Sequence, residues 1–66
     1  MDYRENYVEV DVTILFQTHL AIKVSDGYKT AWISRSCLED PEEEFFDNDS
    51  TTIFVKYSMA REKGLI

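Results

Sequence analysis

The feature that most constrains the fold is a strict alternation of apolar and polar residues over positions 7–17. Side chains alternate between the two faces of a β-strand, and β-branched residues favour strands. The segment therefore predicts a half-buried strand. One parity is apolar throughout, and we expect all five of its side chains on the core face: Val8, Val10, Val12, Ile14 and Phe16.

A second alternating segment, residues 19–25, leads into the pair Asp26–Gly27. This pair tolerates the positive φ angles of a type I′ turn, so it predicts a two-residue hairpin to a strand over 28–33. In this register Ser25 pairs with Tyr28. The aliphatic residues of both strands then share the core face: Leu20, Ile22, Val24, Ala31 and Ile33.

The opposite face of this hairpin carries Trp32. An exposed tryptophan on a sheet needs cover from elsewhere in the chain or from a partner. The sequence leaves open whether Trp32 packs in the core or marks an interface.

The second half of the chain predicts shorter elements. Ser36 and Glu39 have the spacing of a capping box, and Pro41 ends that turn. A fourth strand is expected over 53–55, followed by a helix over 57–63 with Ser58 as a possible cap. The C′ position of this helix suits Gly64, after which Leu65 and Ile66 are expected to fold back onto the apolar face.

Together these segments predict an α+β fold that is mostly β. We expect one domain over residues 1–66, with an antiparallel sheet of three to four strands and a short C-terminal helix. The connections are too short for the crossovers that parallel strands require. A chain of 66 residues is also too small for most deep, water-excluding active sites, and no catalytic motif is present, so we do not expect an enzyme.

Compartment and cofactor signals are sparse. The single Cys37 excludes an internal disulfide, as suits a reducing cytoplasm. No apolar run approaches the length of a membrane span, and the polar start at residues 1–6 is not that of a signal peptide.

No cofactor or metal is expected either. Residues 47–51 resemble the start of a calcium loop, but Thr52 and Ser58 stand where such a loop needs glycine and glutamate. The lone His19 has too few potential co-ligands for a metal site, and its place in an alternating pattern predicts a surface histidine.

All of the net charge of −6 comes from one segment, residues 39–49. Seven of its eleven positions are acids and none is a base, whereas the other 55 residues carry a net charge of +1. A solvated loop that confers solubility is one interpretation. The other is a surface for a cationic partner, in which carboxylates imitate the phosphates of a nucleic acid. The candidate partner-binding residues are Glu39, Asp40, Glu42, Glu43, Glu44, Phe45, Phe46, Asp47 and Asp49.

The seven bases are scattered along the chain, so direct binding of nucleic acid is not expected. A single-strand binding module using Tyr28 and Trp32 beside Lys23 and Lys29 is a weaker alternative. A further alternative is a structural or accessory module. It would be a monomer, or a homodimer that seals the Trp32 face or an open sheet edge.

Two stretches resemble short bacteriophage and plasmid proteins that have no assigned activity. Residues 31–40 are similar to their segment W-I-P-[KR]-S-Q-[IV]-x-D, and residues 60–66 to their closing A-x-E-K-G-L. Residues 21–27 fit their central hairpin. Ser34 stands where those proteins have proline, and Cys37 where they have glutamine. The resemblance covers residues 20–40 and 53–66. It implies an origin in a mobile element and a place in the cytoplasm of a bacterial host.

By type, a small acidic phage protein is similar to inhibitors of host defence, including anti-CRISPR proteins that mimic DNA. The leading hypothesis is therefore a non-enzymatic inhibitor that binds a host nucleic-acid-binding protein, such as a CRISPR surveillance complex. Its acidic segment would enter the basic groove, with Phe45 or Phe46 as an apolar anchor.

Overall fold

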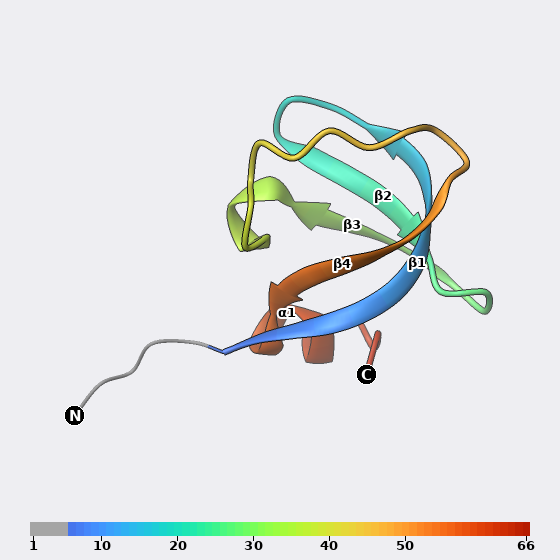
Figure 1. The fold of residues 1–66 in the computed structure, drawn as a ribbon. Coiled ribbons are helices and arrows are strands. Elements are labelled where there is room, and N and C mark those ends of the chain that lie inside the picture. Colours follow the sequence, from blue (N-terminus) through green and yellow to red (C-terminus); the bar gives the residue numbers. More distant parts are fainter. Residues whose placement is uncertain (1–5) are drawn as a thin grey trace.

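Four antiparallel strands and one short helix form the described part of the chain, residues 6–66 of a computed structural model (Figure 1). The polar start of the chain, residues 1–5, lies outside the described residues. The elements are β1 (Tyr7–Gln17), β2 (Ala21–Ser25), β3 (Thr30–Ser34), the 3-10 helix η1 (Arg35–Cys37), β4 (Ser50–Lys56) and α1 (Tyr57–Glu62). The predicted α+β, mostly β architecture is confirmed.

The sheet has the order β3-β2-β1-β4 and is organised around the long β1, which curves through the molecule as one arc (Figure 1). Along its first seven residues β1 pairs with β4, from Tyr7↔Lys56 to Thr13↔Ser50. From Thr13 onward it pairs with β2. The chain after η1 returns to the outer edge of β4, where Leu38 bridges Val55.

The core is entirely apolar and lies on the concave side of this curved sheet. Alternating residues of the strands supply most of it, as the sequence period predicts. Leu38, Phe45 and Ala60 complete it from outside the sheet. The buried residues are Val10, Val12, Ile14, Ile22, Val24, Ile33, Leu38, Phe45, Ile53, Val55 and Ala60.

The prediction that Phe16 lies on the core face is wrong, because β1 contains a β-bulge. Ile14 pairs with Val24, but the next paired residue is Phe16, opposite Lys23. One extra residue in a strand shifts all later side chains to the other face. Phe16 therefore lies on the outward face, where its ring makes an edge-on contact with Trp32 at a centroid distance of 6.2 Å.

The predicted hairpin register is also wrong, by two residues. Ser25 pairs with Thr30 rather than with Tyr28, so the connection has four residues instead of two. Its cause is Asp26, whose Oδ1 accepts hydrogen bonds from the backbone N–H groups of Tyr28 and Lys29 at 2.8 and 2.9 Å. A shift of two leaves the faces unchanged, so Ala31 and Ile33 still lie on the core side.

Leu20 does not join the core. It lies in the turn between β1 and β2 and is 80% exposed. The Thr18 hydroxyl accepts hydrogen bonds from the N–H groups of Leu20 and Ala21 there, which closes the turn before the strand begins.

The ends of the remaining elements differ in detail from expectation. Ser34, not Ser36, caps η1, and β4 extends beyond the predicted 53–55. Lys56 occupies the N-cap of α1.

Gly64 adopts the predicted left-handed conformation, with φ 73°. Leu65 packs against the core as expected, but Ile66 is exposed.

Candidate partner-binding surface

The acidic segment, residues 39–49, crosses the end of the sheet from η1 to the start of β4 (Figure 1). It contains no helix and no strand. Chains without regular secondary structure need other partners for their backbone groups. The geometry of this segment therefore depends on contacts from residues elsewhere in the fold.

Both ends of the acidic segment are hydrogen-bonded to strands. At its start, the Glu39 N–H donates to the Phe54 carbonyl of β4 at 2.9 Å. At its end, the Asn48 N–H donates to the Ile14 carbonyl at 2.6 Å, and the Ile14 N–H donates to the Asp49 carbonyl at 2.9 Å. The segment thereby continues the β1 ladder past the first residue of β4.

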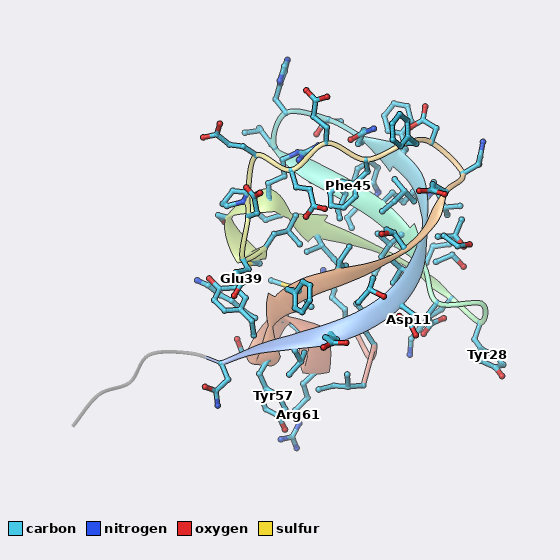
Figure 2. The ribbon with its side chains drawn as sticks, viewed as in Figure 1. Asp11, Tyr28, Glu39, Phe45, Tyr57 and Arg61 are labelled. Carbon is cyan, nitrogen blue, oxygen red and sulfur yellow. The ribbon has the colours of Figure 1, made fainter. Side chains whose placement is uncertain are left out.

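The middle of the segment is fastened by Phe45, which points beneath the segment into the core (Figure 2) and is only 9% exposed. Its carbonyl accepts a hydrogen bond from Gln17 Nε2 at 2.6 Å, and its N–H donates to Gln17 Oε1 at 3.4 Å. The side-chain amide of Gln17 thus pairs with this residue much as a neighbouring strand would.

Arg35 holds the same region from the other side. Its Nη1 donates to the carbonyls of Glu43 at 2.7 Å and Pro41 at 3.2 Å. Its Nε donates to the Thr18 carbonyl at 2.8 Å and its Nη2 to Gln17 Oε1 at 3.0 Å. These partners are all neutral oxygens. The guanidinium also lies 5.9 Å from the centre of the Phe45 ring, within cation–π range.

Arg35 therefore fixes the backbone of the acidic segment while leaving its carboxylates outside these hydrogen bonds. Within the segment, Asp40 Oδ1 accepts from the Glu42 N–H at 3.2 Å. The side chains of all seven acids are exposed: Glu39, Asp40, Glu42, Glu43, Glu44, Asp47 and Asp49.

The structure separates the two candidate apolar anchors. Phe45 belongs to the core and has little surface to offer a partner. Phe46 is 79% exposed and remains the candidate anchor. Solvent exposure of a large ring beside charged residues is a feature of binding surfaces.

Two adjoining hollows, of about 240 and 390 Å³, lie between the acidic segment and the turn after β1. They share Thr18, His19, Arg35 and Glu44 in their walls. Both are open to solvent and neither is a deep cleft. Among residues 6–66 no buried side-chain polar atom lacks a hydrogen-bond partner, and no cluster of histidine, cysteine or carboxylate side chains could hold a metal ion.

Two residues that shape this surface were missed by sequence reasoning, Gln17 and Arg35. Gln17 reads as the polar end of a strand, and Arg35 as one of the scattered bases. Their roles depend on contacts across 28 and 8 positions of sequence respectively, to Phe45 and Glu43. No local pattern signals such contacts.

Comparisons with known proteins find no match for the chain. No family model matches it, and neither a curated protein nor a solved structure is significantly similar to it. In the part of the chain that the structure describes, no helix is long and apolar enough to cross a membrane.

Proposed function

We propose that the acidic segment is a docking surface through which this chain binds and inhibits a nucleic-acid-binding protein of a bacterial host, without catalysing a reaction. The segment would occupy a basic groove in place of nucleic acid. The observation that carries the proposal is the combination of seven exposed carboxylates with a backbone that Arg35 and Phe45 hold in one path.

A fixed backbone matters for this role because mimicry of a phosphate backbone requires charges at defined positions. A mobile acidic loop would lose conformational entropy on binding, which weakens the complex. Here much of that ordering is already present in the free protein. Attraction between the segment and a basic groove would also speed association and weaken as salt increases.

Phe46 adds an apolar contact to this surface. Binding energy in interfaces is concentrated in a few residues, and charged rims alone contribute mainly to rate and orientation. An exposed aromatic ring within the acidic segment would supply the hot spot that carboxylates lack.

The inhibitor class rests on the resemblance of residues 31–40 and 60–66 to bacteriophage and plasmid proteins. By type, small acidic proteins of mobile elements are similar to inhibitors of host defences that read nucleic acid. An anti-CRISPR role against a surveillance complex is the narrowest form of the proposal.

The test compares the unaltered chain with Glu42→Gln/Glu44→Gln. Each variant is immobilised and exposed to nuclease-treated bacterial lysate in low salt, and retained proteins are identified and then purified. Glutamine keeps the size of glutamate, and neither side chain holds the segment's backbone, so the fold should persist. We expect binding to the purified target to weaken about tenfold, because two charge pairs are lost.

The matched control is Glu9→Gln/Glu62→Gln, which changes the net charge equally but outside the acidic segment. It should bind as the unaltered chain does. Short DNA or RNA should displace the chain from the target. Equal weakening by both double variants, or a target that binds nucleic acid and this chain at the same time, would contradict the proposal.

A further inference from the structure

Strand β3 is an open edge of the sheet. It pairs with β2 on one side, and no strand of residues 6–66 pairs with its other side. The opposite edge differs, since Leu38 bridges Val55 and the Glu39 N–H donates to the Phe54 carbonyl along β4.

The flanking hydrogen bonds show which backbone groups of β3 face outward. The Arg35 N–H donates to the Leu20 carbonyl, and the Asp26 N–H donates to the Lys29 carbonyl. In an antiparallel ladder, hydrogen-bonded pairs recur at every second residue. Ala31 and Ile33 therefore bond to β2. The residues whose N–H and C=O groups point away from the sheet are Thr30, Trp32 and Ser34.

This edge lacks the features that natural sheets use to block pairing. Such edges carry charged residues, proline or a bulge. The strand reads Thr-Ala-Trp-Ile-Ser and has none of these, and its ladder with β2 is regular. Ile33 is fully buried and anchors the strand to the core.

We propose that β3 pairs with β3 of a second copy of this chain, antiparallel and about a two-fold axis at Trp32. The outward groups are self-complementary in that register. Trp32 pairs with its own copy, and Thr30 pairs with Ser34 of the other copy. Three such pairs exchange about six backbone hydrogen bonds.

The side chains fit the same register. Trp32 is 44% exposed on the outward face and is steadied by the ring of Phe16, so two tryptophans meet beside the axis. Aromatic cross-strand pairs stabilise sheets. On the core side the small Ala31 lies opposite Ile33 of the other copy. No acid of either copy lies on the paired strands, although each chain carries a net charge of −6.

A contact between five-residue strands is smaller than a standard interface, so we expect a weak dimer, with a Kd on the order of 0.1 mM. The first measurement is sedimentation equilibrium of the full chain from about 10 μM to about 1 mM, in salt high enough to screen the charge. The weight-average mass should rise across this range from near that of the monomer toward that of the dimer. A mass that stays monomeric at every concentration would overturn the proposal.

Amide hydrogen exchange identifies the surface. The N–H groups of Thr30, Trp32 and Ser34 should become protected as concentration rises. Those of Ala31 and Ile33 should be protected throughout, because β2 already bonds them. A mass that rises without this alternating change would place the contact elsewhere and also overturn the proposal.

Ser34→Pro tests the backbone hydrogen bonds of the proposed register directly. Ser34 has φ −62°, the value that proline requires, and its N–H points out of the sheet. The fold should therefore survive with a modest fall in melting temperature, because the Ser34 side chain that caps η1 is also lost. The dimer loses two symmetry-related hydrogen bonds, which should raise Kd roughly tenfold to thirtyfold. An unchanged Kd in the folded variant would contradict the register.

Two lysine substitutions, one on β3 and one on β4, give a matched comparison. Trp32→Lys places two like charges beside the axis and should abolish the dimer. Phe54→Lys makes the same change on the outward face of β4, at a residue that is 42% exposed, and should leave it intact. Equal loss in both would indicate contact through the sheet face rather than through the β3 edge. Neither variant alters the acidic segment, so this result is separate from the test of the proposed inhibition.

Discussion

The acidic segment and strand β3 border the same sheet and offer opposite means of recognition. The acidic segment has no regular secondary structure, and its shape depends on Gln17, Arg35 and Phe45. Its surface chemistry is carried by carboxylates. β3 is regular and uncharged, and it offers a partner the outward-facing N–H and C=O groups of its backbone. One surface is specified by side chains, and the other by strand geometry.

The difference predicts opposite responses to salt. Charge–charge attraction at the acidic segment should weaken as ionic strength rises. Pairing along β3 should instead be favoured by salt, because screening reduces the repulsion between two chains of charge −6. The two surfaces can therefore be assigned separate roles in one titration. A substitution at one surface should leave the other surface unaffected.

The largest expected effect separates two neighbouring phenylalanines. Phe45→Ala removes a buried ring and should lower the free energy of unfolding by about 3 kcal/mol or more. It should also release the middle of the acidic segment. Phe46→Ala should change stability by less than about 0.5 kcal/mol, because its ring is exposed, and should weaken only target binding. Urea unfolding of both variants measures the difference.

Protection of the β3 amides provides the internal control for this pair. In folded Phe45→Ala, Ala31 and Ile33 should keep slow exchange while the Asn48 N–H exchanges faster. Similar stability losses in the two variants would show that Phe45 does not attach the segment to the core.

The sequence predicts the fold better than it predicts either surface. Alternation over β1 and around Ile22 and Ile33 depends on local periodicity, which single-sequence reasoning reads well. The bulge before Phe16 has no such local sign. Its consequence was large, because a single inserted residue turned Phe16 outward beside Trp32.

The candidate site shows the same limit. The acidic cluster is visible in composition, but its order is not, since it depends on long-range hydrogen bonds from Gln17 and Arg35. The choice between Phe45 and Phe46 likewise required the structure. Two adjacent identical residues have the same local propensity, and only the path of the backbone decides which one is buried.

Arg35→Lys tests whether Arg35 holds the backbone path of the acidic segment. Its effect on stability should be smaller than that of Phe45→Ala. Lysine keeps the charge but lacks the planar fork that reaches Thr18, Pro41 and Glu43 together. We expect a loss of about 2 kcal/mol in unfolding free energy. Target binding should fall, although every carboxylate is retained. Unchanged binding in this variant would show that segment order is not needed for recognition.

Gly64→Ala tests the side of the molecule near β3. Gly64 has φ 73°, which L residues adopt at a cost, and an added Cβ would meet the end of the Lys29 side chain. That side chain is flexible, so the backbone cost should dominate, at about 1 kcal/mol. The thermal midpoint should fall, whereas exchange of the acidic segment should stay unchanged. Faster exchange there would mean that the two regions are coupled through the core.

The smallest effect concerns Asp26, in the loop that sets the register of β3. Hydrogen bonds from the backbone N–H groups of Tyr28 and Lys29 hold the pKa of the Asp26 carboxyl below its ordinary value. The folded carboxyl binds a proton less readily than the unfolded one, so its charged form favours folding. This contribution is complete above the ordinary pKa near 4 and is lost as the pH falls through the lower, folded value. Asp26→Asn should therefore be slightly less stable than the unaltered chain at pH 7, and the difference should shrink on acidification. Urea unfolding of both proteins between about pH 7 and pH 2.5 measures it, with all other acids common to the pair. A difference that does not shrink at all on acidification would mean that the charge of the Asp26 carboxyl is not its cause.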